Sequence, residues 1–252
     1  MTADNQTSPF FIFWVLLLSV FLFMAVTLVT GRLAGKSAVV FSELSLITPS
    51  VAVLLLKKLS LRRIFFIEPV SVKSVLIVLL LTAAYFVVAD EINRLLQTFR
   101  PMDADLLSGL KSLMIWENPM QEAALIAGAV ILAPVSEELL MRGFVQGGLS
   151  PYTGHTKALV AGVLCFTFIH FQPWYFIQYF LLGLFLGIFF QRFKSVIPCI
   201  AGHALFNGGV LAVNNIDRPL PGYEWFGHVS PIYLASALII LYTGFKSIYR
   251  RT

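Results

Sequence analysis

The chain has 252 residues, of which 58% are hydrophobic and only 12% charged, and its formal net charge is +5. The charged share is about half that of an average soluble domain, so a water-soluble fold is excluded. Divided into spans of about 20 residues, the chain fits one integral membrane domain over residues 1–252, all α-helical, with about eight transmembrane helices. The Lys and Arg residues form no cluster on a polar domain, so we expect membrane lipid and no nucleic acid as partner.

Three apolar runs predict the spans of the amino-terminal part. Residues 9–30 carry no charge and lack the basic start and small-residue cleavage site of a signal peptide, so we expect them to remain as the first span. The second span covers about residues 38–56, with Glu43 and Pro49 inside it. The third covers about residues 72–89 and is closed by Asp90 and Glu91.

The middle of the chain is more polar. Residues 93–118 contain Pro101, several charges and Trp116, and they predict a segment outside the membrane with one amphipathic helix on its surface. A fourth span begins near Met120, passes through Pro134 and ends at Gly147 and Gly148. The remaining spans are expected at about residues 157–171, 174–191, 195–213 and 230–245.

The distribution of Lys and Arg predicts the orientation. With eight spans and a cytoplasmic amino terminus, twelve basic residues lie at cytoplasmic ends and six at the opposite ends, which favours this orientation. We therefore expect an integral protein of the bacterial inner (plasma) membrane with both termini in the cytoplasm. The twelve are Lys57, Lys58, Arg62, Arg63, Lys73, Arg142, Lys157, Arg192, Lys194, Lys246, Arg250 and Arg251, and the six are Arg32, Lys36, Arg94, Arg100, Lys111 and Arg218.

Three places put ionisable side chains at membrane depth, where such groups are costly and therefore candidates for function. The first is Glu137, Glu138 and Arg142, in which Glu138 and Arg142 can pair along one helix face while Glu137 points elsewhere. The second is His170, at the end of an uncharged span. The third is His203 and Asn207, which lie four residues apart and share a helix face.

Together these groups favour hydrolysis by an activated water. A carboxylate in apolar surroundings is an effective general base, and imidazoles and an amide can bind a metal or stabilise an oxyanion. The zinc-peptidase pattern His-Glu-x-x-His and the serine-nucleophile pattern Gly-x-Ser-x-Gly are both missing. Two alternatives stay open, namely a transporter with a proton relay and a non-catalytic immunity or scaffold protein.

The three motifs also resemble those of a known family. Glu137-Glu138-x-x-x-Arg142, Phe166-x-x-x-His170 and His203-x-x-x-Asn207, in this order on successive helices, are similar to the motifs of the CPBP (CAAX protease and bacteriocin-processing, or Abi) intramembrane endopeptidases. The motif-bearing core covers about residues 120–213. The resemblance implies cleavage of membrane-anchored or lipid-modified protein or peptide substrates, such as CAAX-type carboxyl termini.

Carried over to this chain, the resemblance implies a role for each motif residue. Glu137 would activate water, His170 would polarise the reacting groups, and His203 and Asn207 would bind a metal or stabilise the oxyanion. Glu138 and Arg142 would balance charge in the site. Glu137, His170 and His203 could ligate zinc with water as fourth ligand, and a metal-free mechanism fits the same residues equally well.

Three other features have simpler interpretations. Glu43 either faces the site or is a satisfied buried acid. Gly183 and Gly187 fit close helix packing, and Cys165 and Cys199 look like small buried hydrophobic residues. Because His170 comes late in its span, Glu137 and His170 can meet only near mid-membrane, with the fourth helix offset or bent at Pro134.

Overall fold

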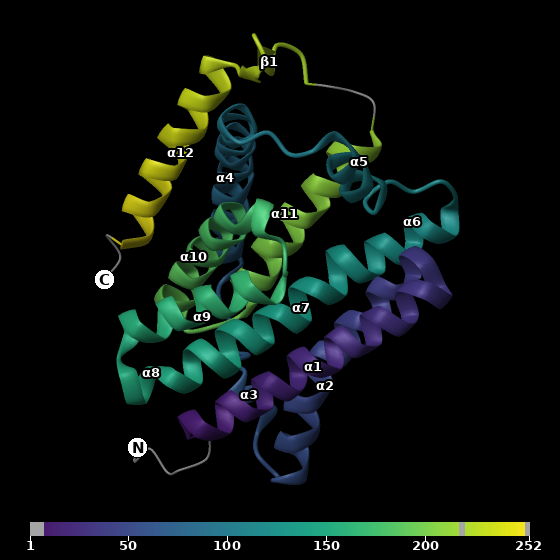
Figure 1. Cartoon of the computed structure of the whole chain (residues 1–252). Coiled ribbons are helices and arrows are strands. Elements are labelled where there is room, and N and C mark those ends of the chain that lie inside the picture. Colours follow the sequence, from purple (N-terminus) through teal and green to yellow (C-terminus); the bar gives the residue numbers. More distant parts are fainter. Residues whose placement is uncertain (1–7, 217–219, 250–252) are drawn as a thin grey trace.

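The computed structural model describes residues 8–216 and 220–249, and these residues form a bundle of helices (Figure 1). Six helical segments in this part of the chain are long and apolar enough to cross a membrane. The segments are Pro9–Leu56, Val72–Phe99, Pro119–Thr153, Pro173–Phe193, Ile197–Asn215 and Pro231–Tyr249. The expected class, a polytopic all-helical membrane protein, is therefore confirmed. Arg218, Arg250 and Arg251, used above for the orientation, lie outside the described residues.

The first long segment is two helices rather than one. It bends at the 3-10 turn η1 (Gly35–Ser37) into α1 (Pro9–Ala34) and α2 (Ala38–Leu56), where Gly35 takes a positive φ of 54°. The two helices lie side by side in Figure 1, and the Thr27 hydroxyl donates to Ser42 Oγ across them at 2.8 Å. With the shorter apolar helix α9 (His155–Ile169), the described residues contain eight apolar rods.

The two ends of the bundle are distinguished by the contacts between their loops. At one end, the basic end, Arg192 Nε donates to the Ile248 carbonyl and Lys57 lies over the Phe11 ring. Both described termini therefore lie at this end. At the other end, the acidic end, Gln178 Nε2 of α10 (Phe176–Phe193) donates to Asn93 Oδ1 of α4 (Val72–Phe99) at 3.0 Å.

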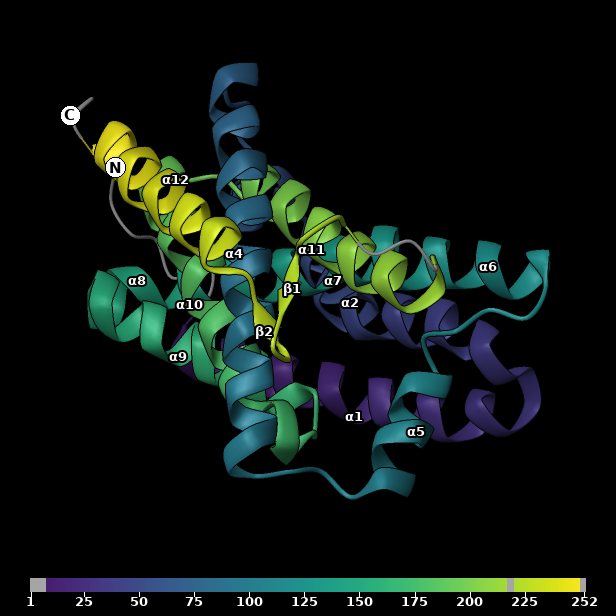
Figure 2. The same cartoon turned by 90° about the horizontal axis from the view of Figure 1, so that it is seen from above.

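Helix α4 runs past its predicted end at residue 89 and continues to Phe99. The helix continues through its acidic residues Asp90 and Glu91. Both contact the region of a small hairpin, β1 (Glu224–Trp225) and β2 (His228–Val229), which lies against α4 in Figure 2. Glu91 accepts from His228 Nδ1 at 2.9 Å and from the Val229 amide at 2.7 Å. These two short strands are an addition to the all-helical prediction.

Tyr223 makes a further contact between the hairpin region and α4. Its hydroxyl donates to Asp90 Oδ2 at 3.0 Å. Burial and the neighbouring Asp90 carboxylate raise the pKa of the Tyr223 hydroxyl, so it stays protonated and remains a donor. The predicted surface helix also forms, as α5 (Ala104–Ser112), with the Asp103 carboxylate accepting from the Asp105 and Leu106 amides.

The fourth span is a long, irregular rod. It consists of α6 (Pro119–Leu125), the π-helical segment η2 (Ile126–Leu132), α7 (Ala133–Glu138), the π-helical segment η3 (Leu139–Gly147) and α8 (Gly148–Thr153). The predicted end at Gly147 and Gly148 is wrong, since the helix continues to Thr153. Gly147 is required for packing instead, because a Cβ there would lie 2.3 Å from Cε2 of Phe66.

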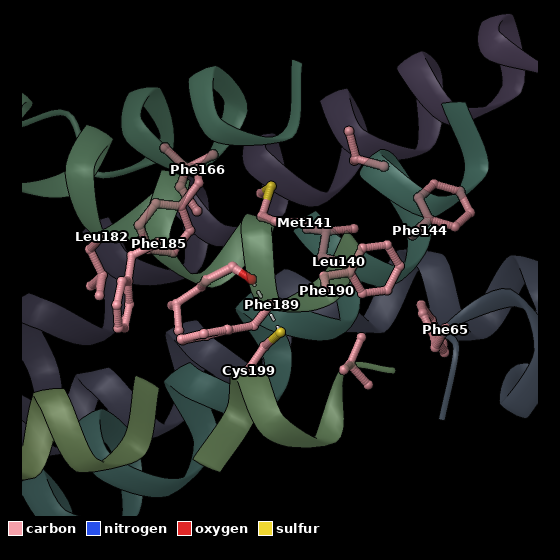
Figure 3. Packing of buried hydrophobic residues seen from close by; sticks show 14 of the residues in the cluster. Phe65, Leu140, Met141, Phe144, Phe166, Leu182, Phe185, Phe189, Phe190 and Cys199 are labelled. Atoms are coloured by element: carbon pink, nitrogen blue, oxygen red, sulfur yellow. Dashed lines mark hydrogen bonds between the residues drawn. The ribbon is translucent and has the colours of Figure 1, made fainter. Parts of the chain in front are cut away.

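The helices α10 and α11 (Ile197–Asn215) pack against this rod, and α12 (Pro231–Tyr249) packs against α4. The short elements α3 (Leu61–Ile64) and η4 (Pro173–Tyr175) lie in the connecting segments. Figure 3 shows the aromatic core, in which Phe185 and Phe189 lie near Cys199, whose thiol donates to the Leu186 carbonyl at 3.3 Å. Both cysteines are free thiols.

Candidate active site

Glu138, Arg142 and His203 form a fully enclosed ion-pair cluster. Arg142 Nε lies 3.0 Å from Glu138 Oε2, one helical turn away, and neither side chain is exposed. His203 of α11 places its Nδ1 3.0 Å from the other oxygen, Glu138 Oε1. Because a carboxylate paired with an arginine is an acceptor, Nδ1 donates and the His203 ring is fixed in orientation. The predicted pairing of Glu138 with Arg142 is therefore present, and His203 joins it.

Phe166 of α9 packs this cluster from the side. Its ring centre lies 4.8 Å from the Arg142 guanidinium and 5.7 Å from the centre of the His203 ring. The aromatic residue of the second motif is thus completely buried and holds two motif side chains. Its neighbour across the helix pair is Gly183, where a Cβ would lie 3.1 Å from the Phe166 ring. The glycines of α10 therefore allow close packing against the site, as the sequence indicates.

Glu137 and His170 form a second group, the open pair. The ring of His170 places Nε2 3.7 Å from Glu137 Oε2, which is longer than a hydrogen bond. Nδ1 of His170 lies 2.7 Å from the Phe166 carbonyl, and since a carbonyl only accepts, Nδ1 carries the hydrogen. The neutral ring then presents the lone pair of Nε2 to Glu137.

Glu137 differs from Glu138 in having no charged partner as close as Arg142, whose Nε lies 3.0 Å from Glu138 Oε2. Glu137 Oε2 is buried and makes no hydrogen bond to any side chain or backbone group in the described part of the chain. Three charged residues act on the Glu137 carboxyl electrostatically: Glu43 and Glu138 repel its charge, and Arg142 attracts it. The acid is therefore held among other charges while one oxygen stays available.

The position of the open pair follows from the length of α9. This helix has 15 residues, so it rises about 22 Å, less than the roughly 30 Å of a bilayer core. A helix of this length that begins at the membrane surface ends inside the bilayer core, so the position of His170 at membrane depth stays a prediction. Glu137 lies in the middle of its rod, and the π-helical turns on both sides of α7 shift its register without a sharp bend at Pro134.

Among the described residues, Asn207 is hydrogen-bonded to the backbone of the fourth rod and to neither group. Its amide Nδ2 donates to the Ala129 carbonyl at 2.9 Å, in the π-helical segment η2. It thus shares a helix with His203 as expected, but one of its two N–H groups is bound to backbone. Its role at the reacting atoms stays a prediction.

The structure does not gather the three predicted zinc ligands into one set. Glu137 meets His170, whereas His203 is turned to Glu138, and among the described residues no three His, Cys, Asp or Glu side chains are arranged to hold a metal ion. A catalytic zinc site needs three protein ligands around one point. The Nδ1 contacts of His170 and His203 leave the Nε2 atom of each ring free, as in zinc-bound histidines, so zinc binding stays a prediction.

Two residues beside the site, Tyr179 and Glu43, belong to none of the three motifs. The Tyr179 ring stacks on His170, with centroids 3.8 Å apart and planes at 24°, but nothing in the sequence distinguishes it from the other aromatic residues. Glu43 accepts a hydrogen bond from Ser136 Oγ at 2.7 Å, so it is a satisfied buried acid and also lies beside the residue that precedes Glu137. Its charge within a span is the signal by which the sequence singled it out.

The comparison with protein families agrees with the motifs. The family described as type II CAAX prenyl endopeptidase Rce1-like matches residues 119–209, a range that begins with α6 and ends within α11. All six predicted site residues lie inside it. The searches of curated proteins and of solved structures gave no match. Residues 119–209 are thus a domain of the Rce1-like type II CAAX prenyl endopeptidase (CPBP) family, a family of intramembrane proteases, and the predicted resemblance is confirmed.

Proposed function

We propose that this protein is an intramembrane endopeptidase that uses Glu137 to activate the attacking water. The substrate is a membrane-anchored or lipid-modified protein, with a prenylated carboxyl terminus as the first class to test because the matched family is described by it. The observation that supports the proposal is the free, buried Glu137 Oε2 beside Nε2 of His170, 3.7 Å away. Both atoms are acceptors, so a single water can donate one hydrogen to each.

In this mechanism Glu137 takes a proton from water as the water oxygen attacks the scissile carbonyl carbon. Nε2 of His170 accepts the second hydrogen of the water and orients it. The carbonyl oxygen becomes an oxyanion in a tetrahedral intermediate. We assign its stabilisation to the second N–H of Asn207 and to Nε2–H of His203, a donor that the His203 ring has when both of its nitrogens carry a proton. When the carbon–nitrogen bond breaks, Glu137 returns the proton to the leaving amine, so the carboxylate is regenerated.

Glu138 and Arg142 act differently in the proposal. They contact each other and His203, with no exposed side-chain surface on either residue. Their role is to hold the His203 ring and to balance charge beneath the site. The proposed steps use no metal, a choice supported by the division of the predicted ligands between two groups of side chains.

We also propose the orientation. The basic end of the bundle, with Lys57, Arg62, Arg192 and Lys194, lies in the cytoplasm of a bacterial inner (plasma) membrane, as positive residues favour. Labelling of single cysteines placed at Ser60 and at Ser108 with a membrane-impermeant reagent tests this. Only the second should react in intact spheroplasts, and the reverse pattern would invert the topology.

Peptide cleavage in nanodiscs tests the function. The probes are a farnesylated CAAX peptide with a fluorophore and quencher, the same peptide without the lipid, and the peptide fused to a transmembrane anchor. We expect the wild type to cleave at least one anchored probe and Glu137→Gln to cleave none. Glu122→Gln, which changes an acid on α6 away from both groups, is the matched control and should keep activity. Equal cleavage by wild type and Glu137→Gln would falsify the proposal.

A further inference from the structure

Helix α2 lies outside the matched domain, yet it places a buried acid beside the site. Glu43 is only 6% exposed, and the Ser136 hydroxyl, on the residue before Glu137, lies 2.7 Å from its Oε2. Burying a carboxyl group at membrane depth is costly, so its presence requires a reason. None of the steps assigned to Glu137, His170 or His203 uses Glu43.

The approach of the two helices is close enough to make this contact specific. At Gly128, a Cβ would lie 2.3 Å from Cγ1 of Val39, so α2 meets η2 where the rod has no side chain. Glu43 follows Val39 by about one helical turn and lies on the same face of α2. Gly128 therefore allows the approach, and Glu43 uses it to reach α7.

Glu43 contacts α7, a segment whose rotation about the helix axis depends on contacts from other helices. α7 has six residues and is flanked by the π-helical segments Ile126–Leu132 and Leu139–Gly147. π-helical turns replace the regular i to i−4 hydrogen bonds, so contacts from other helices are needed to fix the rotation of α7 about its axis. A change in that rotation would swing the Glu137 carboxylate away from His170.

The Ser136 hydroxyl has one hydrogen to donate and three acceptors within reach. Glu43 Oε2 lies at 2.7 Å, whereas the Leu132 and Ala133 carbonyls of its own rod lie at 2.9 and 3.2 Å. The acceptor on α2 is thus the nearest of the three. Of these three acceptors, only Glu43 lies on a different helix, so this bond ties α7 to α2, as the bond between His203 and Glu138 ties it to α11.

We propose that Glu43 is a positioning residue for the catalytic base: its hydrogen bond from Ser136 locks α7 against α2 and so aims Glu137 at the water held with His170. The inference rests on the proposed function of Glu137. It extends the working site beyond residues 119–209. The lock requires an oxygen acceptor at position 43, and it acts on the chemical step and leaves substrate binding unaffected.

A double-mutant cycle on cleavage of the anchored probe tests the lock. We expect Glu43→Leu and Ser136→Ala each to lower kcat by about 10- to 100-fold with little change in KM, since a misplaced catalytic group costs about this much. The double variant should lose no more than either single variant, because both break one hydrogen bond. Glu43→Gln keeps an oxygen acceptor and should recover most of the kcat lost in Glu43→Leu.

The matched control is Ser50→Ala on α2. Ser50 is as deeply buried, but its hydroxyl donates to Ile47 within its own helix, so kcat should stay at the wild-type value. Additive losses in the cycle, a rise in KM with kcat retained, or a Glu43→Gln variant as slow as Glu43→Leu would each overturn the lock. Full kcat in Glu43→Leu beside an inactive Glu137→Gln would also overturn it while leaving the proposed function intact. Should Ser136→Ala fold and Glu43→Leu not fold, Ser136→Ala and Glu43→Gln decide the question alone.

Discussion

Glu137 and Glu138 are adjacent residues of one helix, but their side chains make different contacts. Glu138 belongs to the ion-pair cluster, where Arg142 and His203 engage both of its oxygens at 3.0 Å. Glu137 belongs to the open pair, where Oε2 has no hydrogen bond from the described residues and His170 stands 3.7 Å away. Successive helix residues point about 100° apart. Glu138 therefore points into the ion-pair cluster, whereas Glu137 points toward His170, where it is available to react.

The difference shows how a charged site can persist at membrane depth. A buried charge is tolerated when an opposite charge lies beside it, as Arg142 does beside Glu138 in the ion-pair cluster. Such compensation also removes the acid from chemistry. The cluster therefore stabilises the surroundings, and the open pair is free to bind water.

Glu137→Gln should break the open pair with the largest effect on activity. The amide cannot take a proton from water, so we expect kcat/KM for the anchored probe to fall by about 1000-fold, within the range that general-base catalysis supplies. The unfolding midpoint in detergent should stay unchanged, since Oε2 has no partner to lose. An active variant, or an inactive one that has also lost its fold, would contradict the division between the two acids.

The variant Arg142→Met tests the ion-pair cluster. Removing one member of a buried pair leaves an uncompensated charge on Glu138, which costs about 3–5 kcal/mol of unfolding free energy. Thermal or SDS-induced unfolding of the purified protein measures this loss.

The control for that variant removes both charges. Glu138→Leu combined with Arg142→Met should regain a large part of the stability, because replacing a whole buried pair by apolar residues is often neutral. If the double variant is less stable than Arg142→Met alone, the cluster does not behave as a compensated pair.

The difference between the two acids could be predicted from the sequence only in part. Spacing predicts that Glu138 and Arg142 pair, because residues four apart meet on a helix face. The contact of His203 with Glu138 joins helices 65 residues apart in the chain and has no local signature. The motif resemblance named the right residues, but it could not say which imidazole meets which acid.

The fold shows a similar limit. Hydropathy located the apolar rods because each must bury or face lipid along its whole length. It misplaced the end of the fourth rod, since Gly147 reads as a helix stop but is needed for contact with Phe66. The π-helical segments around α7 were not predictable either, because they depend on backbone hydrogen bonding under packing from α2 and carry no compositional signal.

Tyr179 contacts the open pair through the ring of His170. Its ring lies 3.8 Å from the His170 ring in a stacked geometry, so it fixes the plane in which Nε2 faces Glu137. We expect Tyr179→Leu to lower kcat by about tenfold through loss of that orientation. Tyr179→Phe keeps the stack and loses only the hydroxyl bond to Gln172, so it should retain most of the activity. Equal losses in the two variants would move the effect from the ring to the hydroxyl.

Removal of metal should have the smallest effect. A zinc mechanism needs His203 and His170 on one ion with Glu137, and His203 would then ligate through Nε2 while Nδ1 keeps its bond to Glu138. We expect full cleavage after dialysis against 1,10-phenanthroline and EDTA, and substoichiometric zinc by elemental analysis. A zinc metallopeptidase treated in parallel controls for the efficiency of stripping. Activity that disappears on chelation and returns with zinc would mean that the two groups merge around an ion, and that the separation of Glu137 from Glu138 belongs to the metal-free state alone.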